Sequence, residues 1–214
     1  MELQFLISLA IIHSVALASP GPDFALVVKM ASQESRATAI ASAVGISVAI
    51  LLHSLLCVTG VSLIIKSSDL LFVTVQLIGA SYLGWMGICA IRRTASQWHN
   101  KVSSQAVNGS SHLGLSIKQG FFQGLYTNLL NPKAMVFFIT LFSAMFTPDI
   151  NFITKVSAVL IMLILSLCWF ILIALVLSNP LIQLKVTRAG PVINLVTGIL
   201  FISVAVIIVT GIRI

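Results

Sequence analysis

The chain has 214 residues, of which 58% are hydrophobic and only 8% are charged, and its mean hydropathy is +1.11. Soluble domains carry about a quarter charged residues, so this composition excludes a soluble globular protein and indicates a helical integral membrane protein. The formal net charge is +7, but the basic residues are scattered between apolar segments. No basic stripe with interleaved aromatic residues is visible, which argues against a nucleic-acid partner.

Six apolar segments follow one another along the chain, and each approaches or exceeds the roughly 20 residues that a bilayer-spanning helix needs. They lie near residues 3–28, 37–65, 69–91, 117–146, 152–178 and 190–212. We therefore expect an all-α membrane protein with six transmembrane helices, embedded in the lipid bilayer as one transmembrane domain over residues 1–214. The first segment has Glu2 and no Lys or Arg ahead of it, which favours a retained helix over a cleaved signal peptide. Five spans with an internal amino terminus are the alternative.

Two of the six segments, the first and the fourth, contain proline-rich interruptions. These are Ser19-Pro20-Gly21-Pro22-Asp23 and Asn131-Pro132-Lys133. Proline lacks the backbone donor and its ring clashes with the preceding turn, so each helix should break there. Backbone opened at membrane depth is tolerated only where it is buried in protein or lines a polar cavity. Matching breaks in two halves are typical of a transporter's binding site; a pair of purely structural kinks is the alternative.

The broken segments begin two halves of three segments each. Repeat one covers about 1–91 and repeat two about 117–214. An odd number of spans reverses the direction of the second half, so we expect two inverted three-helix repeats. The segment between them, about 92–116, is rich in Ser, Asn, Gln and basic residues and is predicted to be a flexible cytoplasmic linker.

The basic residues between the apolar segments predict the orientation, because Lys and Arg are enriched on the cytoplasmic side. The loops after the first, third and fifth segments hold eight: Lys29, Arg36, Arg92, Arg93, Lys101, Lys118, Lys185 and Arg188. The opposite side holds three: Lys66, Lys155 and Arg213. We therefore expect the first set in the cytoplasm and both termini outside.

The charges that follow the breaks suggest what binds there. A half-helix that begins after a break presents free N–H groups and the positive end of its dipole. Asp23 suits that position, whereas Lys133 opposes the dipole and needs an anion nearby, either Asp23 or a bound carboxylate. An amino-acid zwitterion fits both charges; the alternative is that Asp23 and Lys133 pair and only lock the halves together. The predicted substrate-binding residues are Pro20, Gly21, Pro22, Asp23, Asn128, Asn131, Pro132 and Lys133.

Titratable groups inside the apolar segments are candidates for proton coupling. His13 and His53 can change charge near neutral pH, and with Asp23 they form the predicted proton-coupling set; a hydrogen-bonded core histidine is the alternative. The sequence has no Walker loop, no zinc-protease spacing and no nucleophile elbow. We expect no enzymatic activity, no cofactor and no metal site, so the energy would come from an ion or substrate gradient.

The motifs together resemble those of the LysE/RhtB-type amino-acid exporters of bacterial inner membranes, and the similarity covers the whole chain. The matching stretches are His13-Ser14-Val15-Ala16-Leu17-Ala18-Ser19-Pro20-Gly21-Pro22-Asp23-Phe24, Tyr82-Leu83-Gly84-Trp85-Met86-Gly87 and Asn128-Leu129-Leu130-Asn131-Pro132-Lys133-Ala134. The first stretch looks most like the threonine-exporter branch.

This resemblance implies a multi-pass inner-membrane protein that acts as a secondary active exporter, by proton-driven antiport, of threonine, homoserine or other neutral amino acids or derivatives. A passive channel or uniporter for small zwitterionic metabolites is the alternative. The faces of small residues on several segments also allow a homodimer, although packing within one chain explains them equally well.

Overall fold

The computed structural model describes residues 2–99, 114–146, 150–177 and 180–211. These residues form eight α-helices and no strand. The helices are α1 (Glu2–Ala18), α2 (Pro22–Gln33), α3 (Arg36–Ser67), α4 (Asp69–His99), α5 (Ile117–Leu129), α6 (Pro132–Met145), α7 (Phe152–Val176) and α8 (Pro180–Gly211). The expected all-α class is confirmed.

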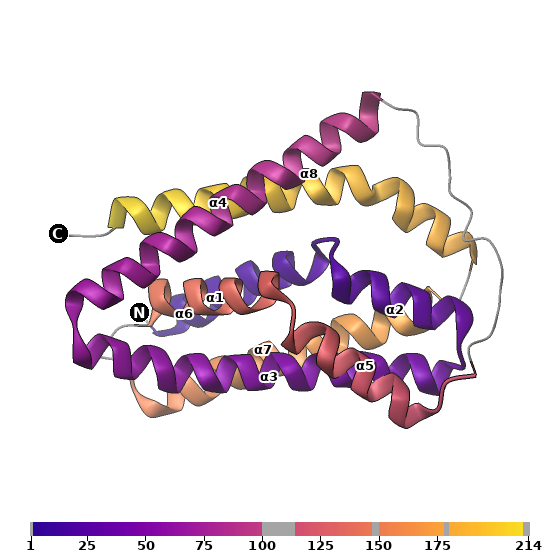
Figure 1. The fold of residues 1–214 in the computed structure, drawn as a ribbon, viewed down its shortest axis with the longest axis horizontal. Helices are drawn as coiled ribbons and strands as arrows, with labels where there is room; N and C mark the ends of the chain where they lie inside the picture. The colour runs from indigo at the N-terminus through magenta and orange to yellow at the C-terminus, as the bar shows by residue number, and fades with distance from the viewer. Residues whose placement is uncertain (1, 100–113, 147–149, 178–179, 212–214) are drawn as a thin grey trace.

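The helices run along the long axis of the molecule as a bundle (Figure 1). The start of α1, the end of α8 and the turn between α3 and α4 lie at one end, and the connection from α2 to α3 lies at the other (Figure 1). Helices α4 and α8 pack together along one side, while α3 packs against α5 and α7 on the other.

Four helices are long and apolar enough to cross a membrane by length and composition. Their spanning portions are Arg36–Gly60, Leu70–Arg92, Phe152–Val176 and Pro191–Gly211. Two further pairs, α1 with α2 and α5 with α6, pass the same test together, and each pair is bent by 57° at its break. The described residues therefore hold four spans, or up to six if each bent pair is one span. The two predicted breaks are present where the prolines lie.

Two helices are longer than the sequence suggested. Helix α4 continues to His99, so the first part of the expected linker is helical, and α8 begins at Pro180 rather than near 190. Thr94 Oγ1, just past the expected end of the third segment, donates to the carbonyl oxygen of Pro191 on α8 at 3.0 Å. The remainder of the expected flexible linker, 100–113, lies outside the described residues.

Glycines allow the closest helix crossings. A Cβ atom on Gly124 of α5 would lie 2.0 Å from the carbonyl oxygen of Ser42 on α3, and one on Gly45 would lie 2.0 Å from that of Phe121. A Cβ on Gly87 of α4 would lie 2.7 Å from the carbonyl oxygen of Gly198 on α8. No other residue fits such contacts, and the expectation that these small-residue faces pack helices closely is confirmed.

Candidate functional site

The two breaks have the local structure that their prolines impose. Gly21 caps α2 with extended backbone, at φ −165° and ψ −172°, and Pro22 is the first residue of that helix. Pro132 takes the same place in α6, behind Asn131, whose Oδ1 accepts a hydrogen bond from the backbone N–H of Lys133 at 3.0 Å. A proline is suited to the first helical position because no N–H is needed there. Asn131 is therefore the N-cap of α6.

Side chains from the second break hold the carboxylate that follows the first. Asp23 Oδ2 accepts hydrogen bonds from Asn128 Nδ2 at 3.0 Å and from Asn131 Nδ2 at 3.2 Å. In the opposite direction, Lys133 Nζ donates to Ser19 Oγ at 2.6 Å. Hydrogen bonds to charged groups are stronger than neutral ones. The two breaks, more than a hundred residues apart in sequence, therefore form one connected polar centre.

Several polar atoms in this centre are buried and have no hydrogen-bond partner among the described residues. They include Asp23 Oδ1, Asn128 Oδ1 and His13 Nδ1. Buried polar atoms are nearly always satisfied in folded proteins, so three unsatisfied polar atoms in one place indicate a position where another molecule forms hydrogen bonds. Two of them, on Asp23 and Asn128, belong to side chains that already hydrogen-bond each other.

A cavity lies at this centre. Its volume is about 50 Å³. Its polar wall is formed by His13, Ser19, Asp23, Asn128, Asn131 and Lys133, with the backbone of Gly21 beside them. Most of the remaining wall is aromatic: Phe24, Phe137, Phe138, Phe170 and Phe201. A small cavity with a few convergent polar groups in an apolar wall is typical of a small-molecule site.

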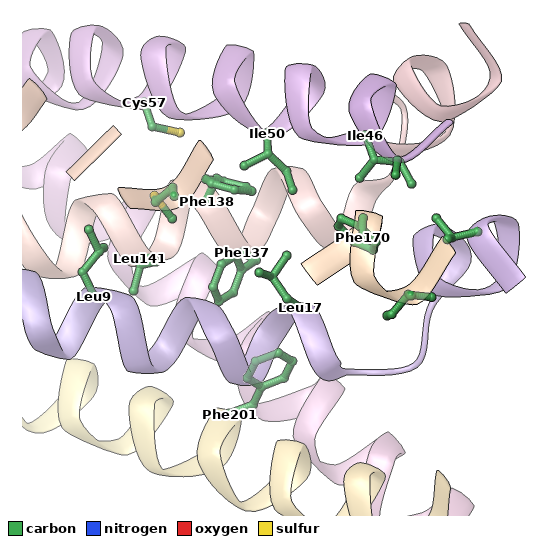
Figure 2. Close-up of a cluster of buried hydrophobic side chains, with 14 of the residues drawn as sticks. Leu9, Leu17, Ile46, Ile50, Cys57, Phe137, Phe138, Leu141, Phe170 and Phe201 are labelled. Carbon is green, nitrogen blue, oxygen red and sulfur yellow. The ribbon is translucent and has the colours of Figure 1, made fainter. Parts of the chain in front are cut away.

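The aromatic wall comes from several helices. Figure 2 shows Phe137 on α6 and Phe201 on α8 approaching the part of α1 that carries Leu17. The ring centroids of Phe137 and Phe201 are 6.0 Å apart, and Phe201 is only 2% exposed. These rings form much of the apolar wall of the cavity, and Phe201 also lies beside Lys133, whose Nζ is 6.0 Å from the ring centroid.

The two intramembrane histidines have different positions. His13 lines the cavity, is 1% exposed, and has its Nε2 at 3.2 Å from Ser166 Oγ on α7. His53 on α3 is not among the residues that line it; its Nε2 donates to the carbonyl oxygen of Asn128 at 3.4 Å, and its ring stacks on Phe138. His53 therefore contacts the site through the backbone of Asn128 and the ring of Phe138 and does not line the cavity.

The structure brings together most of the residues that the sequence singled out. Gly21, Asp23, Asn128, Asn131, Lys133 and His13 line one cavity. Pro20, Pro22 and Pro132 do not line it and act by breaking the helices. Sequence reasoning missed Ser19 as a contact of Lys133, although it opens the first motif, and it missed Ser166, which no local pattern marks. Within the described ranges, no group of three His, Cys, Asp or Glu residues could hold a metal ion.

Comparison with known proteins decides the family. A family model described as "LysE type translocator" matches residues 14–211. The chain belongs to the LysE-type translocators. This LysE-type chain is thus a membrane transporter. The matched region includes both helix breaks and every predicted site residue except His13.

Named relatives cover nearly the whole LysE-type chain. The "Threonine efflux protein" of Escherichia coli K12 is 29% identical over 201 residues, which are 93% of this chain and 94% of the relative. The protein of the same name from Salmonella typhi is 29% identical over 200 residues, covering 93% and 94%. A membrane protein of Haemophilus influenzae is 25% identical over 197 residues, or 92% of each chain. No solved structure matches.

Proposed function

We propose that this LysE-type translocator is a secondary active exporter of a small neutral amino acid across the bacterial inner membrane, driven by proton antiport. The observation that carries the proposal is the cavity at the two breaks, where Asp23 Oδ1 and Asn128 Oδ1 are buried acceptors without partners. The threonine efflux proteins among its relatives support an amino-acid substrate.

The charges of the cavity match the two ends of an amino-acid zwitterion. The unsatisfied oxygens of Asp23 and Asn128 suit the substrate ammonium, which only donates hydrogen bonds. Lys133 lies in the first turn of α6, where the lysine charge and the positive end of the helix dipole both favour a carboxylate. A pairing of Asp23 with Lys133 that only locks the halves is the competing interpretation.

Asp23 also offers a mechanism for proton antiport. One carboxylate oxygen is held by two amides, and the other can take either a proton or the substrate ammonium. Because the two compete for the same oxygen, proton arrival would favour substrate release, and substrate arrival would favour proton release. His13 and His53 stay predictions for proton coupling, beside Asp23.

The arrangement of the helices supports inverted repeats and alternating access. Both broken pairs bend by the same 57°. In two equivalent halves, α1, α3 and α4 correspond to α5, α7 and α8. Helix α3 packs against α5, and the corresponding pair, α7 and α1, is also in contact. The pairs α3–α7 and α4–α8 each join two corresponding helices. Movement of one repeat against the other would expose the central cavity to either side in turn.

A second cavity supports a path out of the site. It has a volume of about 420 Å³ and lies between α1, α4, α6 and α8, lined by Ser8, Gln76, Met145 and Gly211 among others. These residues lie toward the end of the molecule where α1 begins and α8 ends (Figure 1), which the loop charges place outside the cell. Three of its helices, α1, α6 and α8, also contribute to the central cavity.

The test is uptake of labelled threonine, homoserine, leucine and lysine into inside-out vesicles, with and without an imposed proton gradient. We expect gradient-driven accumulation of a neutral amino acid, and its loss in Asp23→Asn and Lys133→Ala. Glu2→Gln and Lys118→Ala, which change exposed charges away from the cavity, are the matched controls and should retain it. Normal accumulation of the amino acid in Lys133→Ala would contradict the proposed site. Downhill movement alone would indicate a passive channel or uniporter.

A further inference from the structure

His13 has a buried ring nitrogen, Nδ1, that forms no hydrogen bond with the helix breaks or with the charged groups of the site. It lies on α1, a little less than two turns before the break, and its side chain lines the central cavity. The residue is 1% exposed, and its Nδ1 has no hydrogen-bond partner among the described residues. The rings beside it, Phe137 and Phe138, have centroids 6.4 Å and 6.0 Å from the imidazole and offer no donor group.

The other ring nitrogen fixes the tautomer of His13. Ser166 Oγ donates its single proton to the carbonyl oxygen of Met162, one turn earlier on α7. The serine oxygen can therefore only accept from His13 Nε2, which lies 3.2 Å away, so Nε2 carries the proton. In a neutral imidazole with its proton on Nε2, Nδ1 is a bare acceptor. The Ser166 contact thus presents an acceptor, not a donor, in the apolar part of the cavity wall.

We propose that His13 Nδ1 accepts a hydrogen bond from a hydroxyl on the substrate side chain and so selects hydroxylated amino acids over their apolar isosteres. The proposal rests on the proposed function, in which Asp23, Asn128 and Lys133 hold the ammonium and carboxylate. Of the buried atoms of the cavity that have no partner among the described residues, Asp23 Oδ1 and Asn128 Oδ1 are assigned to the ammonium, so His13 Nδ1 remains for a side-chain hydroxyl. A substrate without the hydroxyl leaves Nδ1 buried and unsatisfied, which penalises it.

Threonine and valine provide the test, because they have nearly the same shape and differ by a hydroxyl in place of a methyl group. Their affinities for the purified full chain in lipid nanodiscs are measured by competition or calorimetry. We expect wild type to prefer threonine by about ten-fold or more. Equal affinities would overturn this proposal and leave the exporter proposal standing, whereas binding of neither amino acid would overturn both.

Two variants of His13 separate the acceptor from the rest of the ring. In His13→Asn the side-chain oxygen takes the approximate place of Nδ1, while in His13→Gln the side-chain nitrogen takes the approximate place of Nε2 and keeps the contact with Ser166. We expect His13→Asn to retain a preference for threonine and His13→Gln to lose it. A preference for threonine over valine that survives in His13→Gln, or that disappears equally in both variants, would overturn the assignment. Each variant is judged by its own ratio of threonine to valine affinity, which does not depend on how stably that variant folds.

Discussion

Replacing Asn131 with alanine removes two hydrogen bonds at the second break. Its Oδ1 caps α6 by accepting from the backbone N–H of Lys133, and its Nδ2 donates to the carboxylate of Asp23. Loss of an N-cap costs about 0.5–2 kcal/mol, and loss of a hydrogen bond to a charged group costs about 1.5–3 kcal/mol. Because Asn131 is 5% exposed, water does not replace either bond. We expect a loss of about 2–5 kcal/mol in the free energy of unfolding.

The chain contains a matched control for this change. Asn151 caps α7 by accepting from the backbone N–H of Thr154 at 2.8 Å, and its Nδ2 donates to Glu2 at 2.7 Å. The two roles are the same as those of Asn131, but the residue is exposed and water can replace its contact with Glu2. Asn151→Ala should therefore cost only about 1 kcal/mol, the value of the cap.

The assay is reversible unfolding in mixed micelles with a rising mole fraction of denaturing detergent, followed by circular dichroism. A third variant, Asn131→Asp, keeps a cap acceptor but loses the donor and sets a second carboxylate against Asp23, so it should destabilise at least as much as Asn131→Ala. If Asn131→Ala cost no more than Asn151→Ala, or if Asn131→Asp were harmless, the contact with Asp23 would not hold the two breaks together.

Two further predictions concern helix packing and the lysine of the site. Gly124→Ala should destabilise the protein by about 1–3 kcal/mol or more, because the new Cβ would lie 2.0 Å from backbone of α3. Gly60→Ala, whose Cβ would have nothing within 4 Å, should be neutral or stabilising. The same unfolding assay compares the two variants, and equal effects would contradict the close crossing of α3 and α5. Ser19→Ala removes the hydroxyl that accepts from Lys133 Nζ and should cost about 1–3 kcal/mol, while Ser14→Ala, which loses only an exposed bond within α1, should change stability by less than about 0.5 kcal/mol.

Much of the fold could be predicted because it depends on local chemistry. Apolar segments of sufficient length indicate helices at membrane depth, and the prolines break two of them whatever surrounds them, since a proline has no N–H to donate. Asn131 before Pro132 is likewise a cap signal that needs no knowledge of the rest of the fold. The ends of α4 and α8 were mispredicted because hydropathy marks where a helix is apolar and not where it stops, and both helices continue into polar sequence.

The contacts among the candidate site residues could not be predicted from the sequence. The motifs named Asp23, Asn128, Asn131 and Lys133, yet the sequence left open which groups touch. The packing of the two broken pairs places both amides on Asp23 and Lys133 Nζ against Ser19. These contacts join residues from opposite halves, and no periodicity within one segment carries that information.

The sequence by itself determined a helical membrane protein with two proline-broken segments and a small set of polar residues beside the breaks. Only the tertiary structure distinguished His13 from His53, two histidines in similar apolar segments. Packing of α1 against α7 buries His13 in the cavity wall beside Ser166, whereas packing of α3 against α5 places the His53 ring nitrogen on the backbone of Asn128. The physical reason is that a side chain's chemistry is set by its neighbours in space, and in a helical bundle those neighbours come from other helices.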